Sequence, residues 1–546
     1  MRKLIFVFFA VAVVFNLNAR DKYPGSEELE MVFKEINRFK NQYGKLYEAT
    51  SKIKTLYVDT INDNKLQEDA IVGMLQKLDP HSVYIPKDEV KEMNEPLVGS
   101  FDGIGVQFQM IEDSLFVEQT ISGGPSEKVG VLPGDRIVIV NDTSIAGVKM
   151  STPKIMKRLR GKKGTEVNIK VLRRGNKDLI DFKIIRDKIP LFSVDASYMI
   201  APSIGYIKLN KFSATSKKEF DEAFEKLKAQ GMKSLIFDLQ SNGGGYLQTA
   251  YTLADDFLGS KQQIVYTEGR SGRINYLASE KGCFKEGKLI FLVNEYSASA
   301  SEILSGAVQD WDRGIIVGRR TFGKGLVQQP VILNDGSLIR LTTARYYTPS
   351  GRCIQKPYDE GKEKYNKDLV DRYNKGELMT EDSIHFPDSL RYKTLILNRT
   401  VYGGGGIMPD YFVPMDTSIN SKYLIKIVAK GVVNEFASKY FEVHQDEFKQ
   451  AYPSFDEFNT KFFMTDAGLK ELTDLATAEE VPFNQEEFDK SKEFLKIQLK
   501  ALFARRLWDL NAFYQIMNKE NETCQKALEI FTTPGMYESI LNQKKN

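Results

Sequence analysis

Residues 190–350 alternate apolar runs with amphipathic stretches, and this alternation limits the possible folds more than any other feature of the chain. The runs IGYIKLN, SLIFDL, KLIFLV and GIIVG are typical of buried strands, whereas KKEFDEAFEKLKAQG, YLQTAYTLADDFL and ASEILSGAVQDW have helical periodicity. Two later runs, LVQQPVIL and SLIRLTTARYY, predict a hairpin across NDG. Strands and helices in this order predict an α/β fold.

The flanking segments predict further domains, so the chain is expected to be multidomain α/β. Residues 27–95 favour a helical N-terminal domain, and the short strands and two helical pieces of residues 98–187 favour a compact, partly open barrel. The α/β core is expected to span residues 190–415, with a polar insertion at 356–400. Amphipathic helices at 418–546 predict a packing, lid or oligomerisation element.

The first nineteen residues have the pattern of a signal peptide. Arg2 and Lys3 precede the apolar run LIFVFFAVAVVF, and Ala19 is a small residue at a plausible cleavage site. The alternative is an uncleaved anchor, although twelve apolar residues are short for a membrane-spanning helix. The expected location is outside the cytoplasm, in the periplasm of a Gram-negative bacterium, with membrane association if the anchor is retained.

Composition argues against several classes of function. The chain has 76 basic and 73 acidic residues and a net charge of +3, which predicts neither a nucleic-acid partner nor a polybasic membrane footprint. The few cysteines and histidines have no metal-ligand spacing and cannot form a disulfide scaffold (Cys283, Cys353, Cys524, His81, His385, His444). We therefore expect no metal and no cofactor.

Four serines cluster where the strand KLIFLV ends and the next helix begins, at Ser297, Ser299, Ser301 and Ser305. Ser299 and Glu302 have the S-x-x-E spacing of a capping box, which explains the pattern structurally. A nucleophile at the same place would gain from the first-turn N–H groups and the helix dipole, which favour developing negative charge. Composition leaves both interpretations open, because a nucleophile also needs a base.

A glycine-rich stretch after the strand GIIVG nearly matches a phosphate-binding loop. Gly318, Gly323 and Lys324 have the required spacing, but Gly325 stands where a serine or threonine should bind Mg²⁺. A β-like run follows instead of a helix. Both departures argue against nucleotide binding.

Lys324 can instead be a general base. A lysine with an ordinary pKa is protonated at neutral pH, but burial without a counter-ion can lower that pKa by several units. The flanking glycines leave no carboxylate near Lys324 in the sequence, and the nearest acids, Asp312 and Asp335, fall in expected turns. A Ser–Lys dyad would need no histidine.

Several motifs occur together in a characteristic order: SASASEI, TFGKGLVQ after 25 residues, DLQSNGGG (238–245), YYTPSGRCIQ (346–355) and GGGIMPD (404–410). In this order they resemble the C-terminal-processing (tail-specific) serine peptidases, over roughly residues 30–415. The resemblance implies a crotonase- or Clp-protease-like α/β spiral core. It further implies a serine endopeptidase with Ser299 as nucleophile, Lys324 as general base and Gln328 orienting the lysine.

The same resemblance implies an oxyanion hole made by the backbone N–H groups of Ala300 and of Gly244 or Gly245. Gly243 stands where the family usually has proline, so either glycine remains a candidate. On a strand, positions 324, 326 and 328 would point the same way, which would place Gln328 beside the lysine.

The barrel at 98–187 resembles a PDZ domain inserted before the core. Its stretch Gly103, Ile104, Gly105 and Val106 is similar to the loop that binds a peptide's terminal carboxylate. The expected partners are therefore proteins and peptides with a free C-terminus, and the helical regions are candidates for homodimerisation. No nucleotide and no nucleic acid are expected.

Three alternatives remain open at this point. The chain could be a non-catalytic PDZ peptide-binding or chaperone protein with an idle core. It could be a crotonase-like acyl-thioester enzyme, although an exported protein would not meet that substrate. A histidine-based serine hydrolase would need His81 or His385, which we expect outside the core and in the polar insertion respectively.

Overall fold

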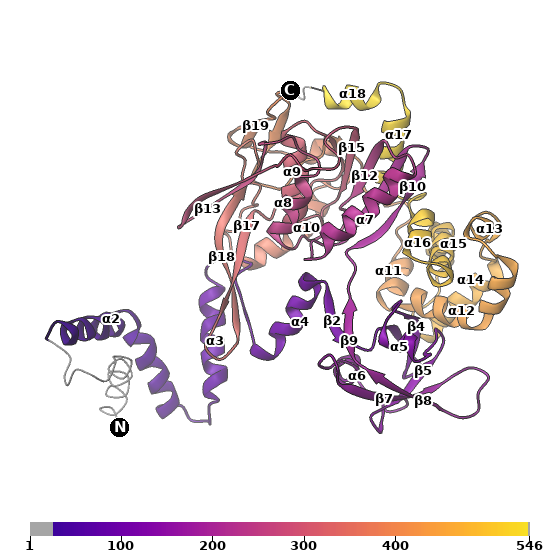
Figure 1. The fold of residues 1–546 in the computed structure, drawn as a ribbon, viewed down its shortest axis with the longest axis horizontal. Coiled ribbons are helices and arrows are strands. Elements are labelled where there is room, and N and C mark those ends of the chain that lie inside the picture. Colours follow the sequence, from indigo (N-terminus) through magenta and orange to yellow (C-terminus); the bar gives the residue numbers. More distant parts are fainter. Residues whose placement is uncertain (1–25, 544–546) are drawn as a thin grey trace. The chain divides into compact units, whose positions relative to one another are not determined.

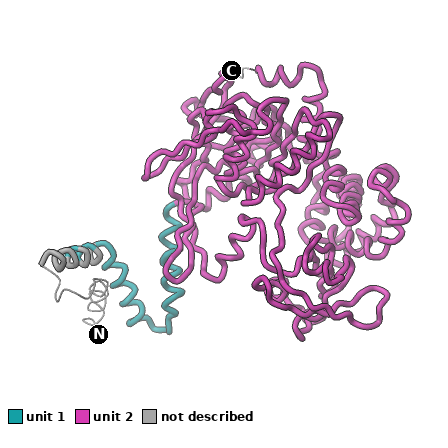
Figure 2. Tube along the Cα trace, in the orientation of Figure 1, with its two compact units in different colours: residues 1–78 teal, residues 79–546 magenta. Residues whose placement is uncertain are grey.

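The computed structural model describes residues 26–543, and the chain divides into two compact units, Met1–Leu78 and Asp79–Asn546 (Figure 2). In the first unit the described residues form helices α2 (Ser26–Leu56) and α3 (Asp63–Leu75). Asn62 caps α3, because its side chain accepts a hydrogen bond from the Lys65 N–H at 3.1 Å.

The division between the units falls within residues 27–95, the stretch predicted as one helical domain, so Asp79 and the residues after it belong to the second unit. The predicted signal peptide, residues 1–19, lies outside the described residues. Across residues 26–543, none of the helices combines the length and the apolar character needed to span a bilayer.

A six-stranded sheet forms the centre of the second unit, in the order β10-β11-β12-β15-β16-β21. The strands β11, β12, β15, β16 and β21 run parallel, and β10 pairs antiparallel with β11. Every residue of β11 is buried, as expected for a parallel sheet covered on both faces. The bounds are β10 (Val194–Ala201), β11 (Ile204–Leu209), β12 (Ser234–Asp238), β15 (Lys288–Val293), β16 (Ile315–Gly318) and β21 (Tyr411–Phe412). This sheet confirms the α/β prediction.

Alternate residues of these strands belong to two different apolar clusters, which include different helices. Figure 1 shows the helices that surround the sheet. Phe237 and Phe291 belong to the core beneath α7 (Ser216–Ala229), α8 (Leu247–Ala254) and α9 (Ala300–Asp310). Their neighbours Ile236 and Ile290 face α17 (Glu522–Thr532) and α18 (Met536–Leu541). The end of the chain therefore completes the core by covering the second face of the sheet.

A second sheet is built around the long strand β18 (Leu338–Tyr347). On one side β18 forms the predicted hairpin with β17 (Leu326–Ile332). On its other side it pairs with β1 (Val83–Ile85) at one end and with β13 (Gln263–Gly269) at the other. A further strand, β14 (Gly272–Leu277), pairs with β13. Strand β1 thus connects the start of the second unit to the hairpin that follows Lys324.

Residues 100–190 form the predicted compact β domain. Its sheet has the order β3-β4-β5-β7-β8, with β6 paired to β5 and β3 at one edge. A separate pair, β2 with β9, joins the domain to the chain on either side. The bounds are β2 (Ser100–Gly103), β3 (Val106–Ile111), β4 (Ser114–Thr120), α5 (Pro125–Lys128), β5 (Arg136–Val140), β6 (Thr143–Ser144), α6 (Thr152–Leu159), β7 (Glu166–Leu172), β8 (Ile180–Ile185) and β9 (Asp187–Pro190).

The remaining elements surround these sheets. Helix α4 (Lys87–Val98) follows β1, and residues 356–400, predicted as a polar insertion, fold back on the core because Arg372 is buried and donates to the Arg320 and Thr321 carbonyls. This segment contains α10 (Lys362–Asn374), two short 3₁₀ turns (Glu381–Ser383, Asp388–Leu390) and β19 (Arg391–Lys393), which pairs with β20 (Thr400–Tyr402).

The predicted C-terminal helices form a cluster with its own apolar core. Capping side chains start most of them, because Ser421, Ser454, Thr465 and Asn484 each accept a backbone N–H three residues later. The bounds are α11 (Lys422–Ala429), α12 (Val432–Ala451), α13 (Phe455–Lys461), α14 (Asp466–Ala478), α15 (Gln485–Leu507) and α16 (Leu510–Met517). An ion pair of 2.6 Å between Arg506 and Glu118 joins the cluster to β4.

Candidate active site

Ser299 lies at the turn where β15 gives way to α9, at the carboxyl edge of the central sheet. Its backbone has φ 58° and ψ −112°, a conformation that a side chain-bearing residue rarely adopts and that costs of order 1–3 kcal/mol. Such strain concentrates at functional sites, where the surrounding structure imposes it.

The other serines of the cluster have structural roles. Ser297, Ser301 and Ser305 are fully buried, and each hydroxyl donates to a backbone carbonyl at 2.7–2.8 Å. Ser299 is only half-buried. The hydroxyl density of this segment therefore reflects packing of the turn, and Ser299 stands apart from its neighbours in exposure and backbone geometry.

Glu302 connects the Ser299 turn to the lysine loop. Its Oε2 accepts hydrogen bonds from the backbone N–H groups of Ser299 at 2.8 Å and Lys324 at 2.9 Å. Its Oε1 accepts from the Thr321 hydroxyl at 2.6 Å and the Gly323 N–H at 2.7 Å. Burial raises the pKa of this fully buried carboxyl to about 7, although the four hydrogen bonds favour its ionised form. The residue expected only as a helix cap therefore fixes two segments together.

Tyr346 holds the same two segments from the carbonyl side. Its buried hydroxyl lies 3.1 Å from the Ser299 carbonyl oxygen and 2.5 Å from the Lys324 carbonyl oxygen. Burial raises the pKa of this phenol well above its ordinary value, so the group keeps its proton and can donate. The backbone N–H and the backbone carbonyl of both Ser299 and Lys324 are thus held by shared partners, Glu302 and Tyr346.

Lys324 sits in surroundings that disfavour its charge. Burial lowers the pKa of its amine below the usual 10.5, and the positive charge of Arg340 lowers it further. Glu302 and Asp79 act in the opposite direction. No carboxylate is near Lys324 in the sequence, but the fold brings both acids close enough to act on its charge. Among the ion pairs of residues 26–543, none includes the Lys324 ammonium at 4.0 Å or less.

Gln328 does not follow the simple strand alternation that we expected. Strand β17 begins only at Leu326, and its pairing with β18 shifts register between Val327 and Gln328. A shift of this kind breaks the period of two, so positions 324, 326 and 328 are not on one regular strand. The Gln328 Nε2 donates to the Leu326 carbonyl and to the Thr342 hydroxyl, each at 3.3 Å.

The glycine loop after β12 packs against the Ser299 turn. A Cβ added to Gly244 would lie 2.8 Å from the Ser299 Cβ and 2.9 Å from the Ala300 backbone nitrogen. The Gly244 N–H donates to the Asn242 Oδ1 at 2.9 Å. The Gly244 carbonyl accepts from the Phe212 N–H, and the Tyr246 N–H donates to the Phe212 carbonyl. These two bonds form a parallel bridge between Phe212 and Gly245, and neither bond uses the Gly245 N–H. Ala300 is the first residue of α9, and its N–H has no acceptor within the helix.

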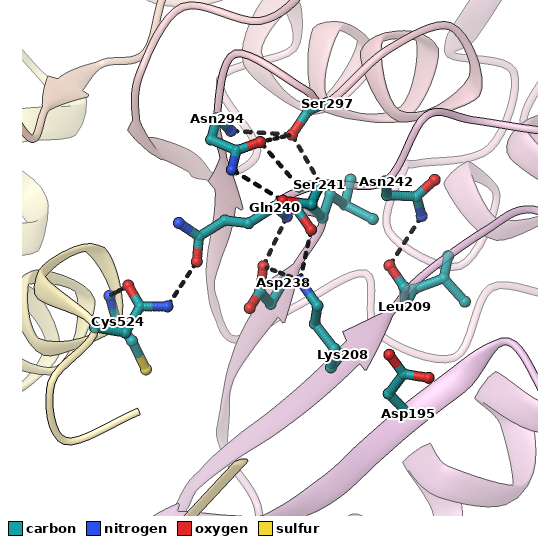
Figure 3. A network of polar contacts seen from close by, with 12 residues as sticks. Asp195, Lys208, Leu209, Asp238, Gln240, Ser241, Asn242, Asn294, Ser297 and Cys524 are labelled. Carbon is teal, nitrogen blue, oxygen red and sulfur yellow. Dashed lines mark hydrogen bonds and ion pairs between the residues drawn. The ribbon is translucent and has the colours of Figure 1, made fainter. Parts of the chain in front are cut away.

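Side chains beneath the loop fix its path, as Figure 3 shows. The buried Lys208 ammonium donates to the Gln240 carbonyl at 2.6 Å and to Asp238 at 3.1 Å. On the other side of the loop, the Asn294 Oδ1 accepts from the Ser241 N–H at 2.8 Å. These contacts attach the loop to β11, β12 and the end of β15, so the glycines approach Ser299 from a rigid support.

The predicted carboxylate-binding residues lie in the compact β domain, at the junction between β2 and β3. Gly103 ends β2, Val106 begins β3, and Gly105 between them has a left-handed φ of 77°. The Ile104 carbonyl accepts from the Ser126 hydroxyl at 2.7 Å and the Gly105 carbonyl accepts from the Ile121 N–H at 2.9 Å. Their carbonyls therefore fix the turn beside the edge strand β3.

We expected His81 to lie outside the core, but the structure places it beside the candidate site. It follows Asp79 at the start of the second unit, and its Nε2 lies 2.8 Å from the Tyr365 hydroxyl. Burial and then the charge of Lys324 lower the pKa of the ring to about 4. The ring is neutral and half-buried, and the charge of Lys324 acts on it, so His81 belongs to the surroundings of the site. Sequence reasoning missed this, because 243 positions separate the two residues.

Comparison with known protein families gives four matches along the chain. Residues 203–361 match peptidase family S41 and residues 103–184 match the PDZ domain family. Residues 10–89 match the activating protease CtpB N-terminal domain, and residues 423–509 match a family of unknown function. The first two matches include every residue predicted for the site.

Comparison with individual proteins extends over most of the chain. The carboxy-terminal processing protease CtpA of Bacillus subtilis is 34% identical over 355 residues, which cover 65% of this chain and 75% of that protein. The carboxy-terminal-processing protease of Bartonella bacilliformis is 35% identical over 361 residues, covering 65% and 80%. Among solved structures, the photosystem II D1 C-terminal processing protease is 29% identical, covers 61% of this chain and 91% of that one, and has a TM-score of 0.34.

Proposed function

Because the chain belongs to the carboxy-terminal processing proteases, a family of serine peptidases, we propose that Ser299 is its nucleophile and Lys324 its general base. The protein is a C-terminal-processing serine peptidase with a PDZ domain, and it binds peptide or protein substrates. The roles of individual residues are our proposal and follow from the geometry described above.

The observation that carries the proposal is the shared support of Ser299 and Lys324. Glu302 accepts the N–H groups of both residues through one oxygen, and the Tyr346 hydroxyl contacts both of their carbonyls. A chain folded for packing alone has no need to fix a strained serine and a buried lysine, 25 residues apart, to the same two side chains. This arrangement supports a pair that acts together.

In the proposed mechanism, the Ser299 hydroxyl attacks a substrate carbonyl while neutral Lys324 takes its proton. Lys324 then gives the proton to the leaving amine, which departs with the C-terminal fragment. Water attacks the acyl-enzyme, again with Lys324 as base, and regenerates the serine. Burial of the amine supports this role, because it lowers the pKa and so enlarges the neutral fraction.

We assign the oxyanion hole to the N–H groups of Ala300 and Gly245. The Ala300 N–H at the first turn of α9 is favoured by the positive end of the helix. Of the two candidate glycines, Gly244 already donates its N–H to Asn242, whereas the bridge to Phe212 does not use the N–H of Gly245. The contact pattern therefore favours Gly245.

Substitutions at the proposed dyad test this function. Ser299→Ala should abolish cleavage of an unstructured peptide with a free apolar tail, and Lys324→Met should lower kcat by a comparable factor. Ser305→Ala is the matched control, because its buried hydroxyl donates only to the Ser301 carbonyl one turn earlier. Cleavage by Ser299→Ala would refute the nucleophile, and full activity in Lys324→Met would refute the base. Tail binding by the wild type without any product would favour a non-catalytic peptide-binding protein instead.

For the tail, we propose that Gly103, Ile104, Gly105 and Val106 receive the substrate's terminal carboxylate. Strand β3 is an edge strand that pairs with β4, so an extended peptide can add beside it. A peptide with an amidated tail should then have a higher KM than the free acid with a similar kcat. Equal KM values for the two peptides would contradict tail recognition.

We also propose export and self-association. The leader of residues 1–19, with Arg2, Lys3 and a twelve-residue apolar run, supports export to the periplasm, and N-terminal sequencing of the mature protein tests cleavage after Ala19. On α2, the exposed side chains of Leu46 and Ile53 lie seven residues apart on one face, which supports a helix-mediated homodimer. A monomeric mass by light scattering at micromolar concentration would contradict the dimer.

A further inference from the structure

The turn that opens the second unit, Asp79–Ser82, lies beside the middle of β18. Strand β1 pairs with Leu338–Arg340 and β13 pairs with residues 344–347, which leaves Thr342 between the two partners. The turn fills this gap, because the Thr342 N–H donates to the Ser82 hydroxyl at 3.0 Å. On its other side, Thr342 is the register partner of Gln328.

The side-chain carboxylate of Asp79 accepts four hydrogen bonds. Its Oδ1 accepts from the N–H groups of His81 at 2.8 Å and Ser82 at 2.9 Å and from the Thr342 hydroxyl at 3.0 Å, and its Oδ2 accepts from the Ser82 hydroxyl at 2.5 Å. Burial alone would raise the pKa of Asp79, but these hydrogen bonds together lower it below 3.8. Asp79 is therefore an ionised carboxylate near neutral pH, and such a group cannot donate.

The state of Asp79 determines the direction of the next hydrogen bond. Because the carboxylate only accepts, the Thr342 hydroxyl must give its single proton to Asp79. The lone pairs of that hydroxyl then remain for Gln328, whose amide can meet them only with its nitrogen. The same nitrogen donates to the Leu326 carbonyl. Both bonds engage the Gln328 NH₂ group, so Oε1 is the amide atom left to accept from another donor.

We propose that Asp79 and Thr342 are positioning residues that set the orientation of the Gln328 amide, so that its oxygen and not its NH₂ group is presented to Lys324. The proposal rests on the proposed function, in which Gln328 orients the lysine. An amide oxygen can accept one N–H of Lys324 and so direct the amine's lone pair, whereas a reversed amide would present a second donor to it. The hydrogen-bonded series Asp79–Thr342–Gln328 thus selects one of the two amide orientations that the Gln328 side chain could adopt.

The central test replaces the Thr342 hydroxyl by a methyl group of the same shape. Thr342→Val should lower kcat about 10-fold, the effect of one hydrogen bond of roughly 1.4 kcal/mol, with KM for a free-tail peptide unchanged. The acid limb of the pH–rate profile should move to lower pH, because ammonium loses its acceptor and the pKa of Lys324 falls. Thr342→Ser keeps the hydroxyl and should recover most of the activity. A Thr342→Val enzyme with wild-type kcat and an unshifted limb would overturn the proposal.

The neighbouring residue provides a matched control. The Thr343 hydroxyl is buried and has no hydrogen-bond partner within the described residues, so Thr343→Val makes the same chemical change without breaking such a bond. This variant should keep wild-type kcat and the wild-type pH profile. An equal loss in both valine variants would show a general effect on β18 and would overturn the specific role of Thr342.

A double-mutant cycle separates this proposal from the function on which it rests. If Thr342 acts through Gln328, adding Thr342→Val to Gln328→Ala should cause no further loss in kcat. Losses that multiply would overturn the positioning chain and leave the Ser299–Lys324 assignment untouched. Wild-type kcat in Gln328→Ala alone would instead remove the role of Gln328, and this proposal with it.

Discussion

The contact between the glycine loop and the nucleophile turn gives a sharp prediction for Gly244→Ala. Gly244 has φ 99°, and a Cβ there would lie 2.8 Å from both the Ala298 carbonyl oxygen and the Ser299 Cβ. Ordinary van der Waals contact begins at 3.4 Å, so the methyl group would be 0.6 Å too close to backbone that cannot rotate away. Either the loop or the Ser299 turn must move.

The size of the effect follows from these two penalties. A left-handed backbone at a residue with a Cβ costs about 1–3 kcal/mol, and overpacking of a tight contact adds about 1–3 kcal/mol. We therefore expect Gly244→Ala to lower the free energy of unfolding by about 2–6 kcal/mol. A displacement of several tenths of an ångström at the reacting groups should lower kcat by roughly 10- to 100-fold.

The assay combines urea unfolding with kcat and KM on a fluorogenic peptide that has a free carboxyl tail. Gly243→Ala is the control, because a Cβ at Gly243 meets nothing within 4 Å and its φ is not left-handed. It should keep kcat and leave the free energy of unfolding unchanged or higher by up to about 1 kcal/mol. Wild-type kcat in a folded Gly244→Ala protein would refute the packing of this loop against Ser299.

Three further predictions concern groups around the site. Burial and Arg340 lower the pKa of Lys324, so kcat/KM should rise with pH as Lys324 loses its proton, at a pH below 10.5. Arg340→Gln should move this rise in the pH–rate profile to higher pH. An unmoved profile would argue against this electrostatic effect. His81→Gln should leave the pH–rate profile above pH 6 unchanged, because the pKa of the ring is about 4. Loss of the rise in rate with pH would instead support a mechanism in which histidine is the base. Glu302→Gln should lower the free energy of unfolding by about 2–4 kcal/mol, because the new NH₂ group would face two of the four N–H and O–H donors. An unchanged urea midpoint would show that these four hydrogen bonds do not stabilise the fold.

Much of the fold could be predicted because the signals are local. The apolar runs before residues 239 and 294 are long enough to identify buried strands, and the order of motifs around Ser299 and Lys324 identified the family. The C-terminal helices were recognised from their periodicity, but periodicity does not say what a helix covers. Nothing local in α17 indicates that it packs on the central sheet.

The unpredicted part of the site depends on contacts between distant residues. Asp79 and Thr342 are 263 positions apart, and only the pairing of β1 with β18 brings them together. Glu302 was visible as a helix cap, but its bonds to residues 321–324 depend on the tertiary fold. The position of Gln328 was inferred from a regular strand, and the register shift after Val327 invalidates that argument.

The central claim is that Lys324 activates Ser299. A fluorophosphonate probe reacts covalently with an activated serine hydroxyl, so its labelling rate can be measured against pH and its site mapped by peptide mass spectrometry. We predict a single adduct on Ser299. The labelling rate should rise with pH as Lys324 loses its proton, and it should fall sharply in a folded Lys324→Met variant. An adduct on another serine, or an unchanged rate in Lys324→Met, would contradict the account.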